Sequence, residues 1–160
     1  MLKDFNKLNK PGRPISLNKD KITKKCLDFY WMNGIDNDSF NNVIKYAGVS
    51  KGTIYRLYGS EDSLQKSVLK EYYNNFLKAR LARLNDPKFT LKDLIMDITS
   101  GLISNKYKCC LHHRSRVEKY KLGKKTRTYI SKVDKLLQTA YLEIVERDLK
   151  KTHRNLSKSD

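Results

Sequence analysis

The sequence lacks the motifs from which most enzymes build an active site. It has no motif of paired carboxylates, no serine in a sharp glycine-flanked turn, and no glycine-rich loop of the kind that cradles phosphate. Cysteine and proline are also scarce, at three residues each. Three cysteines cannot make a fully paired disulfide framework, so reduced thiols are expected. These absences predict a protein that is not an enzyme, needs no cofactor and is not held together by disulfides.

Long apolar stretches are missing as well. No run of about 18 apolar residues occurs, and no basic leading segment is followed by an apolar one. Neither a membrane span nor a signal peptide is therefore indicated, and a cytoplasmic location is expected. The chain has 160 residues, 39% of them hydrophobic. That is enough to bury the core of one globular domain.

Acidic residues are few compared with basic ones. Asp and Glu number 17 against 34 Lys and Arg, which gives a formal net charge of +17. Such a balance favours an anionic partner, and nucleic acid is the commonest, with a lipid surface as the alternative. The basic residues are densest after residue 105, so charge alone does not locate a binding surface.

Apolar residues recur at helical spacing through most of the chain, which predicts an all-α protein of about seven helices. The expected helices cover residues 18–33, 39–47, 50–58, 60–84, 90–104, 109–118 and 124–151. We expect a flexible basic arm at 1–17, a DNA-binding domain at 18–60, a helical regulatory and dimerisation body at 61–152, and a basic tail at 153–160. The Pro-Gly-Arg-Pro sequence at 11–14 cannot continue a helix and marks the arm.

The segment 49–58, Val-Ser-Lys-Gly-Thr-Ile-Tyr-Arg-Leu-Tyr, has the features of a DNA-reading helix. Gly48 supplies the backbone freedom of a tight turn before it, and Ser50 can cap its first turn. Lys51, Gly52 and Thr53 then offer a donor, a position without a side chain, and a donor-acceptor. This combination suits a helix end placed against base edges.

The chain from Ile22 to Leu69 resembles the TetR/AcrR family of bacterial transcriptional regulators. The sequence Ala-Gly-Val-Ser-Lys-Gly-Thr-Ile-Tyr, followed by Gly-Ser-Glu-Asp-Ser-Leu, carries the resemblance most specifically. The matching residues are Ile22, Leu27, Phe29, Tyr30, Gly34, Ser39, Val43, Ala47, Gly48, Val49, Ser50, Gly52, Thr53, Ile54, Tyr55, Gly59, Ser60 and Leu64. The resemblance implies a helix-turn-helix head on a helical regulatory body.

The resemblance, together with the residue types, assigns roles on double-stranded DNA. Lys51 and Thr53 are predicted to read bases and Tyr55 and Arg56 to hold phosphate. Arg13 either reaches the minor groove or belongs to a solvated arm. The full predicted set is Arg13, Ser39, Ser50, Lys51, Gly52, Thr53, Tyr55 and Arg56. The chain departs from the family at Leu57, where relatives commonly have histidine, and at Glu61, where they commonly have lysine.

For the body, the resemblance implies an effector pocket and a homodimer. The predicted pocket residues are Phe76, Leu102, Cys110, His113 and Tyr141. The predicted dimer contacts lie on the apolar face of the last helix, some of which we expect to stay exposed in a monomer: Val133, Leu137, Ala140, Tyr141 and Ile144. The leading hypothesis is an effector-responsive repressor, and the alternative is a short regulator that binds DNA without an effector.

Cysteine and histidine cluster at Cys109, Cys110, His112 and His113, which are residue types that zinc prefers. The pairs 109/112 and 110/113 point about 100° apart on a helix, so four ligands would need an irregular backbone to converge. Core cysteines with solvated histidines are the alternative, and no metal is expected. Cys26 lies on the inward face of the first helix and is predicted to be a small core residue.

Overall fold

The computed structural model describes residues 18–36, 38–104 and 110–156, with the backbone alone at 101–104 and 152–156. These residues form helices and loops, with no strand among them, which confirms the predicted all-α class. The helices are α1 (Lys19–Asn33), α2 (Phe40–Ala47), α3 (Lys51–Tyr58), α4 (Glu61–Tyr72), the π-helical turn η1 (Tyr73–Leu77), α5 (Lys78–Leu84), α6 (Leu91–Ser104), α7 (Leu111–Val117), the 3-10 turn η2 (Lys119–Lys121) and α8 (Lys124–Leu156).

The first four helices begin at a side-chain cap. Asn18, Ser39, Ser50 and Ser60 each accept a hydrogen bond from the backbone amide three residues further on. Each bond satisfies one of the amides that a helix start leaves unpaired. The cap predicted at Ser50, at the start of α3, is therefore confirmed.

The long fourth helix expected from residue 60 to 84 is present as α4, η1 and α5 in continuous succession. Its middle widens into a π turn at Tyr73–Leu77, and the Lys78 amide donates to the Tyr73 carbonyl five residues back. Spacing of apolar residues does not reveal such a turn. Counting this succession as one helix, the described chain has the seven helices expected.

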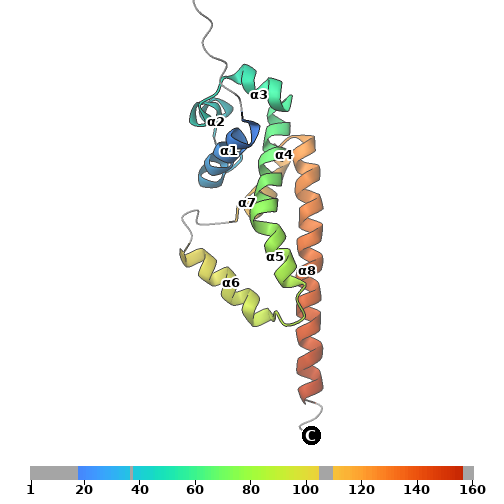
Figure 1. Ribbon diagram of the computed structural model, residues 1–160. Coiled ribbons are helices and arrows are strands. Elements are labelled where there is room, and N and C mark those ends of the chain that lie inside the picture. Colours follow the sequence, from blue (N-terminus) through green and yellow to red (C-terminus); the bar gives the residue numbers. More distant parts are fainter. Residues whose placement is uncertain (1–17, 37, 105–109, 157–160) are drawn as a thin grey trace, which may run out of the picture.

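Two long helices form the axis of the molecule. Figure 1 shows α8 running beside α4 and α5, with α1, α2 and α3 gathered at one end and α6 crossing the side of the body. The C-terminal end of α8 lies at the opposite end from α3. α8 continues to Leu156, beyond the predicted end near residue 151, because no glycine or proline interrupts it. The predicted tail therefore begins inside this helix.

One continuous core joins the head to the body. It extends from residues of α1, α2 and α3 through Leu64 and Leu69 of α4 to Ile130 and Val133 of α8. Cys26 is fully buried within it, and burial raises the pKa of its thiol to about 11. The predicted structural role of Cys26 is thus confirmed. A smaller cluster at the far end joins Leu84 to Ile144.

Asp62, in the first turn of α4, fastens the start of α8 to the head. Its carboxylate accepts hydrogen bonds from the backbone amides of Lys125 and Thr126, both at 2.9 Å, and the Thr126 hydroxyl donates to the Asp62 carbonyl. Gly123 permits this approach, because a Cβ there would lie 2.2 Å from the Asp62 Cγ. The cap of α8 is therefore supplied by another helix.

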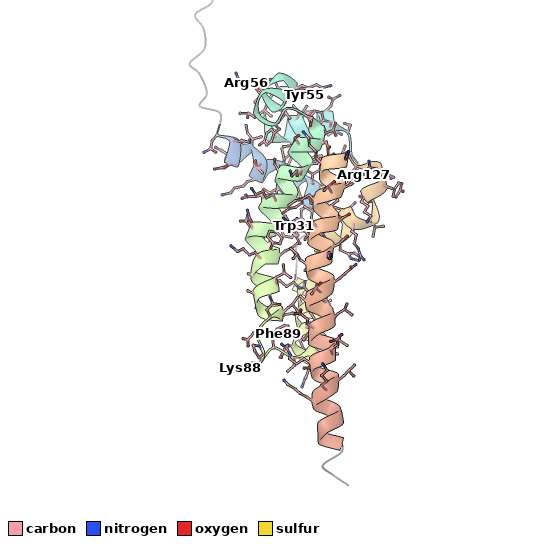
Figure 2. The ribbon with its side chains drawn as sticks, turned by 90° about the vertical axis from the view of Figure 1, so that its right-hand side faces the viewer. Trp31, Tyr55, Arg56, Lys88, Phe89 and Arg127 are labelled. Carbon is pink, nitrogen blue, oxygen red and sulfur yellow. The ribbon has the colours of Figure 1, made fainter. Side chains whose placement is uncertain are left out.

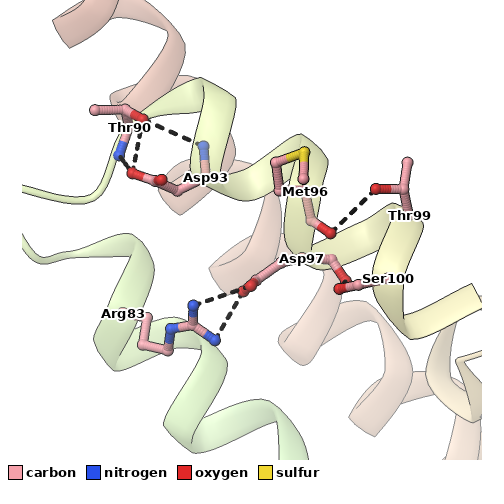
Figure 3. A network of polar contacts seen from close by, with 7 residues as sticks. All are labelled: Arg83, Thr90, Asp93, Met96, Asp97, Thr99 and Ser100. Atoms are coloured by element: carbon pink, nitrogen blue, oxygen red, sulfur yellow. Dashed lines mark hydrogen bonds and ion pairs between the residues drawn. The ribbon is translucent and has the colours of Figure 1, made fainter. Parts of the chain in front are cut away.

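The helix α6 is held to α5 at its first turns. Thr90 and Asp93 form a capping box at its start: the Asp93 amide donates to the Thr90 hydroxyl, and the Thr90 amide donates to the Asp93 carboxylate (Figure 3). One turn further along, the Arg83 guanidinium lies 2.8 Å from the Asp97 carboxylate. This ion pair links α5 to α6.

Candidate nucleic-acid interface and cavity

The turn between α2 and α3 has the geometry of a helix-turn-helix. Gly48 ends α2 in the left-handed region, at φ 70° and ψ 37°, where a residue with a side chain would be strained. The Lys25 ammonium of α1 donates to the Ala47 carbonyl in the last turn of α2. This contact ties α1 to the turn that sets the direction of α3.

The helix α3 divides into a buried face and an exposed face. Ile54 is completely buried in the head, and Tyr58 is nearly so. The Tyr58 hydroxyl donates to the Lys19 carbonyl at 3.1 Å and lies 2.8 Å from the Thr23 hydroxyl. Thr23 and Tyr58 thereby anchor the end of α3 to α1. This role was not assigned from the sequence. The available signal was a hydroxyl-bearing residue on the inward face of each of the two helices.

The exposed face of α3 carries four of the eight predicted DNA-contact residues. Lys51, Gly52, Tyr55 and Arg56 are exposed, and Figure 2 shows Tyr55 and Arg56 together at the head end of the molecule. The Lys51 ammonium lies 5.9 Å from the centre of the Tyr55 ring, whose other neighbour is the Phe40 ring at 6.3 Å. The structure therefore brings these side chains onto one surface.

Three predicted contact residues have structural bonds as well. The Ser50 hydroxyl accepts from the Thr53 amide at 3.1 Å and lies 3.0 Å from the Thr53 hydroxyl. The Ser39 hydroxyl accepts from the Asn42 amide at 3.3 Å. Ser39 and Ser50 are exposed and Thr53 is half-buried. Arg13 lies outside the described residues.

Gly52 lies at the start of the exposed face, and the fold does not require a glycine at this position. A Cβ built there would have a single neighbour within 4 Å, the Ser50 hydroxyl at 3.9 Å. The residue lies in helical backbone rather than in the left-handed region. Nothing within the described chain explains why this helix position has no side chain.

Glu61 lies close enough to Lys51 for their charges to interact. Burial raises the pKa of Glu61 above its usual value, while the Lys51 charge acts to lower it. The carboxylate thus offsets part of the positive potential at the start of α3. This is a local effect of having glutamate at position 61, where the family that the sequence resembles commonly has lysine.

A cavity of about 370 Å³ opens in the body between α5, α6, α7 and α8. Three of the predicted pocket residues, Cys110, His113 and Tyr141, line it together. Phe76 does not line it and contacts Trp31 of α1 in another groove, so its predicted place in this pocket is wrong. Leu102 lies in α6, and its side chain is outside the described residues.

One wall of the cavity holds a buried polar pair. His112 is 3% exposed, and its Nε2 lies 2.9 Å from the Asp134 carboxylate. Burial lowers the pKa of His112 below its usual value, and the charges of Arg116 and His113 act in the same direction against the effect of Asp134. The expectation of a solvated histidine is therefore wrong at position 112 and right at His113, which is exposed.

Metal ligands do not converge among the described residues. No group of three or more His, Cys, Asp or Glu side chains there is arranged to hold an ion. Cys109 lies outside the described residues. The Cys110 thiol instead accepts a hydrogen bond from the Tyr72 hydroxyl at 3.3 Å.

The predicted dimer contacts on α8 need correction. Val133, Leu137, Ala140 and Ile144 are each at most 8% exposed, because this face of α8 packs against α4, α5 and α7 within the same chain. Tyr141 is half-buried and lines the cavity. The prediction underestimated how completely the rest of the body covers α8. Among its described side chains, the large exposed apolar ones are Leu136, Leu142 and Leu149.

Comparison with solved structures establishes the architecture. The crystal structure of a TetR/AcrR family transcriptional regulator superposes with a TM-score of 0.62 over 84% of this chain and 72% of that one, at 18% identity. A TetR family regulator from Agrobacterium tumefaciens gives a TM-score of 0.67 over 83% and 72%, at 16% identity. The chain has the TetR/AcrR fold. The predicted resemblance is thus confirmed at the level of the fold.

Sequence comparisons add one relative. No protein-family model matches the chain. Among curated proteins, the HTH-type transcriptional repressor ComR of Escherichia coli strain K12 is 21% identical over 91 residues, which is 57% of this chain. The aligned stretch spans 43% of the length of ComR. Within the part of the TetR/AcrR-like chain that the structure describes, no helix has the length and apolarity needed to cross a membrane.

Proposed function

We propose that the protein is a sequence-specific regulator of transcription that binds double-stranded DNA through α3. The observation that carries the proposal is the exposed start of α3, where a donor at Lys51 flanks a glycine that the fold does not require. A helix without a side chain at this position can approach a groove floor closely. The TetR/AcrR fold and the curated repressor among the similar proteins support the same function.

The contacts divide into two kinds on this proposal. Lys51 and Thr53 face base edges in the major groove, where donors and acceptors differ between base pairs. Tyr55 and Arg56 lie further along the exposed face and hold phosphate, which fixes orientation but carries no sequence information. Ser39 at the start of α2 faces a phosphate of the same site.

The cavity favours an effector-responsive regulator over the alternative that binds DNA without an effector. Its wall includes α7, whose opposite side reaches the head: the Arg114 guanidinium donates to the Asn33 carbonyl at 2.7 Å. The same guanidinium occupies the space beside Gly34, where a Cβ would lie 2.7 Å from it. A ligand that shifts α7 would therefore move the end of α1 and, with it, the head. Repression relieved by such a ligand is the mode we propose.

A homodimer on a two-fold symmetric site completes the proposal. Leu142 and Leu149 are each more than half exposed and lie two turns apart on the outer face of α8. Apolar side chains on one face of a helix are suited to pairing with the same face of a second copy. With a net charge of +17, the two copies repel each other, so the dimer should strengthen as salt screens that repulsion.

The experiment that tests the proposal compares Lys51→Ala with Arg56→Ala on a duplex selected from a random pool. Lys51→Ala should reduce the discrimination between selected and scrambled duplexes by about 1–3 kcal/mol. Arg56→Ala should weaken binding to both duplexes alike and reduce the salt slope by about one unit per subunit contact.

Exposed basic residues outside α3 give matched controls, with Lys70→Ala on α4 paired to Lys51→Ala and Arg127→Ala on α8 paired to Arg56→Ala. Each control removes the same charge as its partner. Lys70→Ala should leave discrimination unchanged, and Arg127→Ala should leave both the affinity and the salt slope unchanged. If Lys51→Ala discriminates as well as Lys70→Ala, α3 does not read the sequence in the way proposed.

A further inference from the structure

The cavity in the body has an apolar part and a polar part. Leu77, Ile98, Leu137 and Tyr141 supply apolar and aromatic surface. The polar side chains come chiefly from α5, α7 and the middle of α8. A volume of about 370 Å³ is in the range of pockets that enclose a small organic molecule.

Two arginines on this wall have no bonding partner among the described residues. Arg80 of α5 and Arg116 of α7 both line the cavity, and among the described residues neither guanidinium takes part in a hydrogen bond or an ion pair. The Nε atom of Arg80 is buried and has no hydrogen-bond partner there. A buried donor without an acceptor is costly, and an acceptor placed in the cavity would relieve that cost.

The acidic group on the wall is already engaged. The Asp134 carboxylate lies 2.9 Å from the His112 Nε2, so it already interacts with the imidazole. The charges of Arg116 and His113 also reach His112, where they oppose its protonation. Two guanidinium groups against one occupied carboxylate leave the wall with a net positive charge at neutral pH.

We infer that the cavity binds a small organic acid, with a carboxylate or phosphate group held by Arg80 and Arg116 and an apolar body packed against Ile98, Leu137 and Tyr141. This inference rests on the proposed function, since it names the ligand class of the regulator's effector. Guanidinium groups match a planar anion through paired N–H donors. A cationic ligand would face the same two groups without a free carboxylate to neutralise it.

Ligand binding to the free protein, measured by isothermal titration calorimetry, tests the inference. The probes are phenylacetate, benzoate, hexanoate and phenyl phosphate, each beside an uncharged counterpart such as phenylacetamide, with 2-phenylethylamine as the cation. At least one acid should bind at millimolar concentration or below. Its counterparts, and the variants Arg80→Gln and Arg116→Gln with that acid, should bind at least about tenfold more weakly.

Arg127→Gln is the matched control, because Arg127 is an exposed arginine of α8 that does not line the cavity. It removes the same charge and should leave acid binding unchanged. The inference is overturned if no acid binds, if the amide or amine binds as tightly as the acid, or if Arg127→Gln weakens binding as much as the cavity variants. Because DNA is absent from this experiment, failure of the proposed DNA binding would appear separately.

Discussion

Replacing Gly52 by alanine separates the demands of folding from those of DNA binding. Gly52 is exposed in the first turn of α3, and its backbone is helical. A Cβ there would meet only the Ser50 hydroxyl, at an ordinary contact distance of 3.9 Å. The folded protein can therefore accept a methyl group at this position without any rearrangement.

The expected effect on stability is a small gain. Glycine in a helix interior costs roughly 0.5–1 kcal/mol relative to alanine because the unfolded chain loses more freedom. Gly52 is the second residue of α3 rather than an interior one, so the gain should be near the lower figure. For a chain of this length, about 0.5 kcal/mol corresponds to a rise of roughly 1–2 °C in the melting temperature.

The expected effect on DNA binding is opposite in sign. If α3 lies against a groove floor, an added methyl group must displace well-packed atoms. Overpacking of this kind costs about 1–3 kcal/mol in a packed core, which corresponds to about five- to 150-fold in affinity. Thermal melting followed by circular dichroism measures the first effect, and fluorescence anisotropy with a labelled duplex measures the second. Unchanged affinity would refute the close approach, and a fall in melting temperature would refute the account of the free space.

Gly59→Ala provides the contrasting control. Gly59 ends α3 at φ 81°, where an L-residue is strained even though nothing lies within 4 Å of its Cβ position. Alanine there should destabilise the protein by about 1–2 kcal/mol. Its effect on the affinity of the folded protein for DNA should be small. Gly52→Ala should therefore raise stability and weaken DNA binding, whereas Gly59→Ala should lower stability and leave DNA binding nearly unchanged.

Two further predictions concern the body. Asp62→Asn should destabilise the protein by about 1–3 kcal/mol, because the carboxylate caps α8. Burial acts to raise the pKa of Asp62, but hydrogen bonds from Thr126 and Lys125 outweigh it and hold the pKa below its usual value. The stabilisation is therefore present above about pH 4 and is lost as the pH falls through the lowered pKa, so the difference between wild type and variant in urea unfolding should shrink in acid. Leu142→Lys should reduce self-association in light scattering while leaving the melting temperature unchanged, and an unaltered dimer would contradict the proposed face of α8.

Local signals in the sequence predicted much of the head. Ser39, Ser50 and Ser60 are caps whose bonds reach only three residues along the chain, so they can be inferred without tertiary structure. Gly48 is similar, because its left-handed turn is a backbone requirement. The exposed face of α3 follows from helical periodicity once Ile54 is taken as buried.

The features that sequence reasoning missed depend on contacts between distant segments. Helical spacing showed that Leu137 and Ile144 share an apolar face, but not whether the same chain or another copy would cover it. The pairing of His112 with Asp134 joins two helices, and the π turn at Tyr73–Leu77 leaves no mark in the apolar pattern. Each of these depends on how α4, α5, α7 and α8 pack together.

Selection of double-stranded DNA from a random pool is the most direct test of sequence reading by α3. The purified protein and its Lys51→Ala variant should be taken through the same rounds at the same salt concentration. The account predicts that the wild type enriches one motif with two-fold symmetry and that the variant loses or alters preference within each half-site. A wild-type pool without any motif, or an identical motif for both proteins, would contradict it.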